Sequence, residues 1–582
     1  MLGIVWESAP GIVTGGLVCR IASSLVPIAV LAVSKWIIDA IVAAHKGQPV
    51  PWFFWWLVAT EFALGALGAV LSRATGFFDT VLADRMTKHI AVKIMRHASK
   101  LDLASFEDPA FHDKLERARV QATDRLSTIH EIGTAIQQVV LALSFSISLF
   151  VFSPWLLLLL ILCVVPAFLA ESHYAFVGYS LNFRQTPVRR QMDYLRILGA
   201  SKESAKELRL FGLGDFITGE FERLSNEIHR DNVSLARRRF SAVSMLAVVS
   251  SAGYYGVYAW VIYSTMKGDL SIGTMTFLTG SIAGASTSIQ GVFTLFSSVA
   301  DQALFLTDLL DFFATRPRIS SKPDALRMPR PIREGFVFEN VSFAYPGSER
   351  QILNGLNLRL EPDTRVALIG ENGQGKTTIV KLLTRLYDPT AGRILLDGVD
   401  LREYDIEDLQ REVGVIFQDF MRYEMTVRHN IGVGDIQRTD DAAGIELAAA
   451  KSLADVVVGR LDGGMEQMLG RRFVGGVDLS GGEWQKIALA RAYFRDAQVL
   501  ILDEPTAALD AIAEYEVFER FADLTAGKIA LLISHRFSTV RMATRIVVLA
   551  DGKIVEEGNH EQLMSLGKKY AEMFELQAAN YR

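Results

Sequence analysis

The chain has 582 residues, a net charge of −5 and an apolar fraction of 50%. The mild charge, and a sequence without basic clusters interleaved with aromatic residues, argue against a nucleic-acid-binding protein. The two cysteines, Cys19 and Cys163, lie in apolar runs, so neither a zinc site nor a disulfide framework is expected. Apolar residues are concentrated in the first half. This predicts a membrane domain over 1–315, a linker over 316–335 and a soluble α/β domain over 336–582.

Apolar segments in the first half are long enough to cross a bilayer as helices, which takes about 20 residues. The six segments lie at about 11–43, 52–83, 127–152, 154–183, 240–266 and 272–312. The first has no basic leading region and no clear cleavage site, so we expect a retained helix and not a signal peptide. Several segments exceed one crossing, which predicts helices that continue beyond the lipid as stalks.

The connections between these segments alternate between short and long. The long connections, at about 84–126 and 184–239, are charged, and the second contains twelve Lys or Arg residues. Basic loops favour the cytoplasmic side, which also places both chain ends there. Trp52, Trp55 and Trp56 are then expected at the outer interface, where aromatic belts form.

Each long connection carries a short patch of aromatic and turn residues at its expected tip. The patches are 105–111, with Phe106 and Phe111, and 211–216, with Phe211 and Phe216. They are either docking elements or ordinary loop tips.

Polar residues interrupt several apolar segments. They are Arg20, Glu61, Glu171 and His173, together with many hydroxyl residues in the last segment. Ionised groups are costly at the bilayer centre, so such residues usually face a protein interior or a wet cavity. Lining of a polar pathway and close helix packing through small residues remain equally good interpretations.

The strongest motif lies at Gly370, Glu371, Asn372, Gly373, Gln374, Gly375, Lys376, Thr377 and Thr378. It fits G-x-x-x-x-G-K-[ST], and it follows an expected strand and precedes an expected helix, as a phosphate-binding loop requires. The glycines let backbone N–H groups face phosphate oxygens, and the helix N-terminus adds its positive end. Lys376 is expected to reach the β- and γ-phosphates, and Thr377 to offer its hydroxyl to Mg²⁺. A Gly-rich turn with a chance lysine is the alternative.

Further polar residues follow apolar runs in the soluble half. Asp503 and Glu504 end the run 499–502, and ligands bind at the carboxyl ends of strands in open α/β sheets. Asp503 is expected to hold Mg²⁺, and Glu504 to orient and deprotonate an attacking water. Gln418 ends another such run.

Other features fit a nucleotide site less specifically. Ser480, Gly481 and Gly482 open a helical stretch, where exposed backbone donors suit a phosphate. Tyr345 follows a predicted strand and is either a base-stacking aromatic or a core residue. His535 ends a further apolar run.

Taken together, the phosphate-binding loop and the run 479–483, placed about twenty residues before Asp503 and Glu504, resemble the ATP-binding cassette (ABC) transporters. The resemblance is to an exporter-type half-transporter and covers essentially the whole chain, in the membrane half by layout more than by motif. It implies an all-α six-helix transmembrane domain with long cytoplasmic stalks, fused to an α/β P-loop ATPase domain. It also implies that the two loop-tip patches are coupling helices.

The resemblance implies a role for each motif residue. Tyr345 is expected to stack on adenine, and the loop from Gly370 to Thr378 is expected to hold the phosphates. The residues expected to meet Mg²⁺ are Thr377, Gln418 and Asp503, and those expected to serve catalysis are Glu504, His535, Lys376 and Gln418. The segment from Ser480 to Gly482 is expected to close over the ATP of the partner subunit, and Asp510 is expected to touch that subunit. Two departures are Glu483, where Gln is commoner, and the segment 471–478, which lacks the acidic loop often placed there in exporters. The second departure puts in doubt any contact between that segment and the coupling helices.

In this family each ATP lies between two subunits, so the resemblance implies two chains, ATP and Mg²⁺. A homodimer is the first expectation, and a heterodimer with another half-transporter is the second. The expected activity is ATP-driven export of an amphipathic small molecule, lipid or peptide across a bacterial plasma (inner) membrane. Alternatives are import of a metal-chelate compound, or an ATP-gated regulator or channel.

Overall fold

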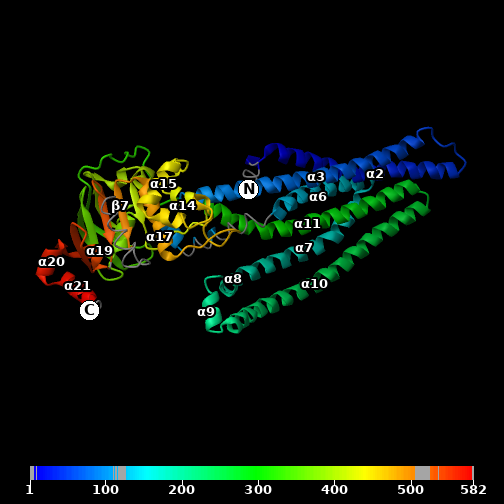
Figure 1. Ribbon diagram of the computed structural model, residues 1–582. Coiled ribbons are helices and arrows are strands. Elements are labelled where there is room, and N and C mark those ends of the chain that lie inside the picture. Colours follow the sequence, from blue (N-terminus) through cyan, green and yellow to red (C-terminus); the bar gives the residue numbers. More distant parts are fainter. Residues whose placement is uncertain are drawn as a thin grey trace. The chain divides into compact units, whose positions relative to one another are not determined.

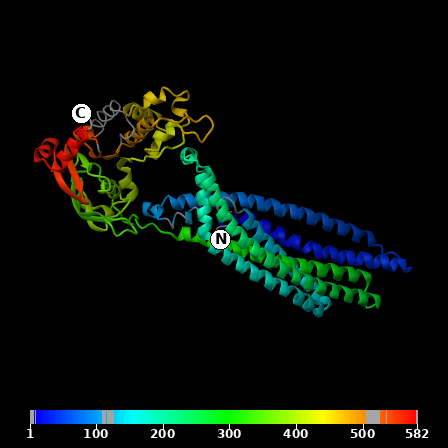
Figure 2. The same ribbon diagram turned by 90° about the horizontal axis from the view of Figure 1, so that it is seen from below.

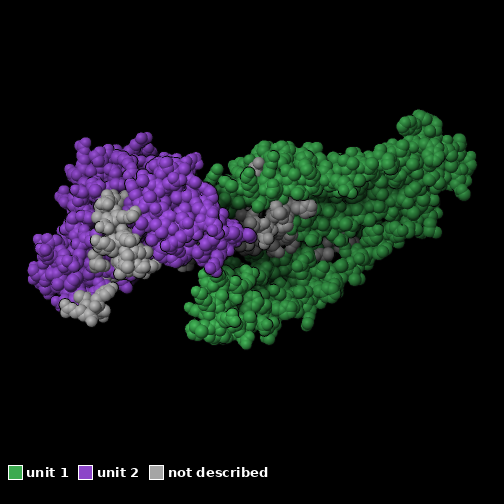
Figure 3. Space-filling view, in the orientation of Figure 1, with its two compact units in different colours: residues 1–100, 109–316 green, residues 101–108, 317–582 purple. Residues whose placement is uncertain are grey.

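The structure is a computed structural model. It describes the chain except for residues 1–5, 8, 109–110, 112–113, 116–125, 505–524, 535 and 580–582, and except for the side chains of 126–130, 163–164, 167, 296–308, 538 and 578–579. The chain forms two compact units, coloured separately in Figure 3. The helical unit comprises Met1–Lys100 and Pro109–Arg316, and the α/β unit comprises Leu101–Asp108 and Pro317–Arg582.

The helical unit is built from long helices that run beside one another, as both Figure 1 and Figure 2 show. They are α2 (Pro10–His45), α3 (Phe54–Ala98), α6 (Leu126–Phe152), α7 (Pro154–Arg184), α10 (Gly214–Met266) and α11 (Ile272–Ala314). The short helices α8 (Thr186–Ala200) and α9 (Ala205–Leu210) connect α7 to α10. The six predicted apolar segments thus correspond to helices, which confirms the predicted all-α fold of this half.

Two of these helices extend well past their apolar segments. α3 reaches Ala98, and α10 begins at Gly214, although the apolar segments end near 83 and begin near 240. The 53 residues of α10 span about 80 Å at 1.5 Å per residue, far more than the roughly 30 Å of a hydrocarbon core. The predicted stalks are therefore present.

Four helical segments in the described part of the chain are long and apolar enough to cross a membrane. They are Pro10–His45, Phe54–Ala98, Glu131–Phe152 and Gly214–Met266. Large side chains on these helices stay exposed, including Trp52 and Trp55 beside the first turn of α3. Apolar surface of this kind is expected where lipid is the solvent.

Close packing explains part of the small-residue content of the last segment. A Cβ atom on Gly284 of α11 would lie 2.5 Å from the ring of Phe145 on α6, so only glycine permits this approach. Ser281 and Ser288 are buried in the same helix. Ser286 faces a cavity instead, so the hydroxyl residues of α11 divide between packing and cavity lining.

The polar residues of the apolar segments also divide. Arg20 on α2 is buried and donates two hydrogen bonds to Asp79 on α3, at 2.6 and 2.5 Å. The Glu61 carboxylate accepts a hydrogen bond from Ser34, whereas His173 is exposed. Arg20 therefore links helices within the unit and does not face an open path.

The α/β unit contains two sheets. The smaller sheet has the antiparallel order β2-β1-β4-β5, from β1 (Phe336–Ala344), β2 (Gln351–Leu360), β4 (Ala391–Leu396) and β5 (Val399–Asp400). The larger sheet has the order β10-β9-β3-β8-β7-β6, from β3 (Arg365–Ile369), β6 (Val413–Ile416), β7 (Val499–Asp503), β8 (Ile529–Ile533), β9 (Arg545–Ala550) and β10 (Lys553–Gly558). All its pairs are parallel except β9 with β10.

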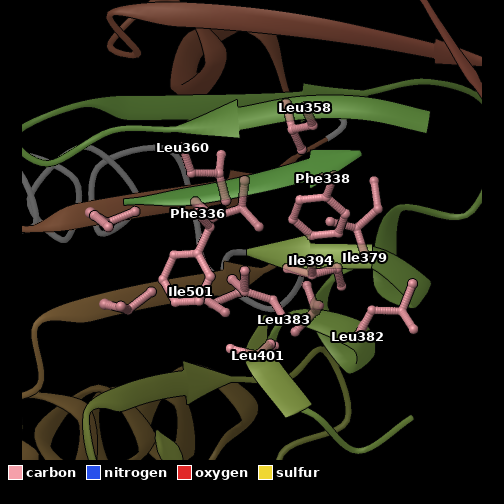
Figure 4. Packing of buried hydrophobic residues seen from close by; sticks show 14 of the residues in the cluster. Phe336, Phe338, Leu358, Leu360, Ile379, Leu382, Leu383, Ile394, Leu401 and Ile501 are labelled. Atoms are coloured by element: carbon pink, nitrogen blue, oxygen red, sulfur yellow. The ribbon is translucent and has the colours of Figure 1, made fainter. Parts of the chain in front are cut away.

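Successive side chains of the central strand β3 point to opposite faces of the larger sheet, so they contribute to the core on both sides of it. Val366 and Leu368 of β3 pack toward the smaller sheet and α12 (Lys376–Leu383), a cluster that Figure 4 shows in part. Ala367 and Ile369 face the opposite side of the sheet, against α19 (Phe537–Val540), α20 (His560–Leu566) and α21 (Lys569–Ala579). Both faces of β3 are covered, as a parallel strand requires, so its sequence is continuously apolar.

The remaining α-helices of this unit fall into two groups. α4 (Leu103–Glu107) and α13 (Ile406–Arg411) pack against the core of the two sheets. A separate helical layer is formed by α14 (Val427–Gly432), α15 (Ala442–Lys451), α16 (Ala454–Val458) and α17 (Gly481–Arg495). The start of α17 packs with α14 to α16 around Trp484, while Leu489 and Ala492 pack against β7. α17 therefore joins this helical layer to the sheet.

We expect the Arg20–Asp79 pair to be important for stability. Asp79→Asn leaves the buried guanidinium without its counter-charge, and breaking such a pair costs about 3–5 kcal/mol. Thermal unfolding of the purified protein in detergent should show a clearly lower unfolding temperature for Asp79→Asn than for wild type. The control Glu7→Gln removes an exposed carboxylate that lies 3.6 Å from Lys93, and it should change little. Equal unfolding temperatures for Asp79→Asn and wild type would contradict this role.

Candidate functional site

The predicted phosphate-binding loop connects β3 to α12 and has a shape that requires glycine. Gly370 has φ +153°, and a Cβ atom there would lie 2.5 Å from the Leu549 carbonyl oxygen. Gly375, the N-cap of α12, has φ +94°, and its Cβ would lie 2.7 Å from the side chain of Leu353. At these two positions the neighbouring residues leave no room for a Cβ atom. The glycines therefore keep the loop close to the N-terminus of α12, where backbone N–H groups can face an anion.

The other loop residues tie the loop to neighbouring elements. The Gln374 side-chain oxygen accepts a hydrogen bond from the Asp551 N–H at 2.6 Å. Glu371 forms a 2.9 Å ion pair with Lys569 at the start of α21. Asn372 and Gly373 are exposed, so they are free of core packing.

Lys376 is buried at the centre of the loop. Its Nζ donates to the carbonyl oxygens of Gly370 at 2.7 Å and Glu371 at 3.0 Å. Burial lowers the pKa of Lys376, although the nearby carboxylates of Glu504 and Asp503 act in the opposite direction. A phosphate group is a stronger counter-charge than two carbonyl dipoles, so the site suits an anion.

Asp503 reaches the same place from the end of β7. The register of β3 and β7 on either side of β8 puts Asp503 beside Ile533, and Leu368 beside the same residue. Asp503 is 2% exposed and accepts a hydrogen bond from the Thr377 hydroxyl at 2.9 Å. Burial raises the pKa of Asp503, and Glu504 raises it further, while Thr377 lowers it.

Glu504 follows in a left-handed backbone conformation, with φ +48°. Its N–H donates to the Ile533 carbonyl oxygen at 2.9 Å, which fixes the turn to β8. Its carboxylate accepts a hydrogen bond from the Gln418 amide at 2.9 Å. This backbone conformation is unfavourable for every residue except glycine, and residues that adopt it cluster at functional sites.

The oxygen donors here fit a magnesium ion. Thr377, Asp503 and Gln418 offer a hydroxyl, a carboxylate and an amide oxygen, and Mg²⁺ prefers oxygen ligands completed by water and substrate phosphates. Groups of three or more His, Cys, Asp or Glu with metal-binding geometry are absent from the described residues. A cage made only of protein carboxylates is therefore not formed by that part of the chain.

Tyr345 lies beside the loop, after β1. Its hydroxyl is 3.1 Å from the Thr378 hydroxyl oxygen, and the Nζ of Lys381 lies 5.0 Å from its ring centroid. The ring also packs edge-on against Phe343. The aromatic predicted from sequence thus contacts the loop helix as well as the core, which is compatible with both interpretations made above.

Ser480, Gly481 and Gly482 begin α17, and Ser480 is exposed. Ser480 and Glu483 form a capping box. The Glu483 carboxylate accepts from the Ser480 N–H at 2.9 Å, and the Ser480 oxygen accepts from the Glu483 N–H at 3.4 Å. Hydrogen bonds link neither Ser480 nor the two glycines to the phosphate-binding loop in the described part of the chain. Within the described residues, the start of α17 and the phosphate-binding loop are thus two separate groups of predicted site residues.

The capping box explains the first departure from the family pattern. α20 begins with the same device, formed by Asn559 and Gln562. Glutamate and glutamine therefore serve the same function at the third helical position of the two helices. The remaining predicted site residues, Asp510 and His535, lie outside the described residues.

The first loop-tip patch has polar contacts that sequence reasoning missed. Glu107 accepts hydrogen bonds from Lys381 Nζ at 2.9 Å and from the Tyr387 hydroxyl at 2.6 Å. Burial raises the pKa of Glu107, but these hydrogen bonds outweigh it and hold the pKa below its usual value. Because Lys381 lies on α12, the segment 101–108 binds directly to the helix that begins at the phosphate-binding loop.

The second loop-tip patch belongs to the helical unit. Phe211 and Phe216 are 65% and 70% exposed, between the end of α9 and the first turn of α10. Gly212, with φ +63°, makes the turn between them. Phe111, from the first patch, is buried instead and packs near Phe312.

Comparisons with known proteins agree with this geometry. The ABC transporter family matches residues 353–507. The chain is 30% identical to the subtilin transport ATP-binding protein SpaT of Bacillus subtilis, over 95% of this chain and 90% of that protein. It is 27% identical to the nisin transport ATP-binding protein NisT of Lactococcus lactis subsp. lactis, over 96% and 92%. The fold matches that of a bacterial Atm1-family ABC exporter with ATP bound, at a TM-score of 0.81, 22% identity and 98% coverage of each chain.

An ATPase cassette fused to long membrane helices defines a transport ATPase. This chain belongs to the ABC transporter family, and it has the exporter arrangement over its full length. It binds ATP and couples the hydrolysis of ATP to transport, as predicted from the sequence.

We predict that Glu483→Gln preserves the cap but removes a pH dependence. Hydrogen bonds from the Ser480 N–H and hydroxyl hold the pKa of Glu483 below its usual value. The resulting stabilisation is present above the unfolded-state pKa and is lost as pH falls through the lower folded-state pKa. Thermal unfolding from pH 7 to pH 4 should therefore show a wild-type advantage over Glu483→Gln that shrinks toward acid. An advantage that grows toward acid would contradict the assignment.

Proposed function

We propose that this protein is a homodimeric exporter that moves an amphipathic molecule out of a bacterial cytoplasm by alternating access. The carrying observation is the convergence of Lys376, Asp503, Glu504 and Gln418 at one edge of the larger sheet, in a chain with long apolar helices. A site of this composition supports nucleotide hydrolysis, and the helices support a path through lipid.

The residues of the cluster have distinct roles in this proposal. Lys376 exchanges its carbonyl partners for the β- and γ-phosphates of ATP. Glu504 holds the attacking water and accepts its proton, while Gln418 fixes the carboxylate through the observed hydrogen bond. Mg²⁺, held by Thr377, Asp503 and Gln418, would neutralise charge on the phosphates.

The separation of Ser480 from the phosphate-binding loop supports a dimer. Ser480 is exposed and Gly481 and Gly482 are half-buried at the start of α17, so the N–H groups of the two glycines can meet the ATP bound by another chain. ATP held between two cassettes binds tightly only to the closed dimer, so it shifts the population toward closure. Hydrolysis removes the γ-phosphate contacts and allows reopening.

Movement reaches the membrane helices through the segment 101–108 in this proposal. Its contact with α12 is supported by Glu107, and it continues directly from the stalk of α3. A shift of the phosphate-binding loop is therefore transmitted to the end of a membrane helix. Both chain ends and the cassette lie in the cytoplasm, as the basic loops indicate.

The names of relatives provide starting points for the cargo. Subtilin and nisin appear in the names of relatives aligned over 95% and 96% of this chain. A lipid A-core flippase of Syntrophus aciditrophicus is 30% identical over 85% of the chain. We propose an amphipathic peptide or lipid as the cargo class, because molecules of both kinds can move along a path between apolar helices.

We expect Glu504→Gln to retain ATP binding but to lower the rate of hydrolysis by about a hundredfold or more, because the general base is lost. Phosphate release from protein in lipid nanodiscs measures the rate, and a fluorescent ATP analogue measures binding. Glu403→Gln is the matched control, since its exposed carboxylate pairs with Lys322 away from the site. Wild-type turnover in Glu504→Gln would contradict the assigned role.

A further inference from the structure

The helical unit contains a cavity of about 360 Å³ between α7, α10 and α11. Its wall combines an acidic residue, aromatic rings and small polar side chains. The residues relevant here are Phe168 and Glu171 of α7, Tyr254 of α10, and Ser286, Gln290 and Phe293 of α11. A cavity of this size accommodates a drug-sized molecule, and polar groups on one side of an apolar wall select its orientation.

The acidic residue of this wall is already paired. Glu171 forms an ion pair with Arg239, which lies on α10 where the stalk becomes apolar. The Glu171 side chain is 20% exposed and that of Arg239 is 47% exposed. The Glu171 carboxylate therefore lies in the more enclosed position, and the Arg239 guanidinium reaches it from a position that is more open to solvent. A charge in such a place needs a partner, but the arginine can exchange this partner for water.

The rest of the wall is uncharged and includes three aromatic rings. The rings of Phe168 and Phe293 stack at 3.8 Å between centroids, and Tyr254 stacks at 6.4 Å on Tyr258, which lies outside the cavity wall. The Gln290 amide donates to the Ser286 hydroxyl at 3.2 Å. Aromatic faces attract cations and apolar groups alike, whereas they offer nothing to an anion. The lining residues thus carry one formal charge, and it is negative.

We propose that this cavity binds an amphipathic cation. Its ammonium, guanidinium or phosphonium group replaces Arg239 at Glu171, and its apolar part lies against Phe168, Phe293 and Tyr254. The displaced Arg239 no longer links α10 to α7, so binding loosens this pair of helices. The inference rests on the proposed export function and deepens it, because it names the charge of the cargo and the residue that recognises it.

The test uses two ions of equal shape and opposite charge, tetraphenylphosphonium and tetraphenylborate. Binding is measured by equilibrium dialysis with the full-length protein in lipid nanodiscs, as the excess over protein-free nanodiscs, because lipid alone takes up hydrophobic anions more strongly than cations. The variants are Glu171→Gln, Arg239→Gln and Arg239→Lys, and Glu61→Gln is the control because it removes a carboxylate of the apolar segments that does not line the cavity. Basal ATPase activity and size-exclusion elution show that each variant is folded.

Opposite effects of the two neutralising variants are the expected result. Glu171→Gln should weaken phosphonium binding about tenfold or more, since a hydrogen-bonded charge partner is lost. Arg239→Gln should strengthen it, by about threefold, because the competing cation is gone. Arg239→Lys and Glu61→Gln should stay within about twofold of wild type.

Three results would overturn the inference. They are loss of phosphonium binding in both neutralising variants, unchanged binding in Glu171→Gln, and tighter binding of the borate than of the phosphonium. The first would make the ion pair merely structural, and the third would make Arg239 the recognising residue. ATP-driven uptake of the phosphonium into inverted vesicles tests export separately, so a binding site without transport would contradict only the proposed function.

Discussion

A buried lysine that donates to two carbonyl oxygens in the described part of the chain is the constraint on which this structure depends. Lys376 is enclosed between the sheets and α12, where two carbonyl oxygens are the acceptors of its hydrogen bonds. Asp503 and Glu504 stand nearby but are engaged with Thr377 and Gln418. The loop therefore suits an anion that brings its own negative charge, and ATP together with the proposed magnesium ion would satisfy all these groups.

The same helix that holds this lysine also holds the link to the membrane helices. Lys376 and Lys381 lie on α12, five positions apart, and Lys381 contacts both Glu107 and the ring of Tyr345. The α/β unit thus includes residues 101–108, although they lie between two membrane helices in the sequence. The proposed transmission from the loop to the membrane domain depends on this one short helix, because it carries both Lys376 and the partner of Glu107.

The sequence predicted what depends on local patterns. Hydropathy accumulates over twenty residues, so the long helices were predicted, and the loop from Gly370 to Thr378 was predicted because its shape is encoded by adjacent glycines. The pairs Arg20 with Asp79 and Glu107 with Lys381 are 59 and 274 positions apart, and only tertiary packing brings them together. Glu171 was noticed as a polar interruption, but its partner Arg239 depends on how α7 packs on α10.

The central claim is that one chain supplies the phosphate-binding loop and another supplies Ser480 to the same ATP. Two tagged chains, one with Lys376→Ala and the other with Ser480→Arg, can be co-expressed and purified as the mixed dimer in lipid nanodiscs. The mixed dimer contains one intact composite site, so it should hydrolyse ATP although neither variant does so alone. A mixed dimer as inactive as its parents would show that each site forms within a single chain, and it would contradict the account.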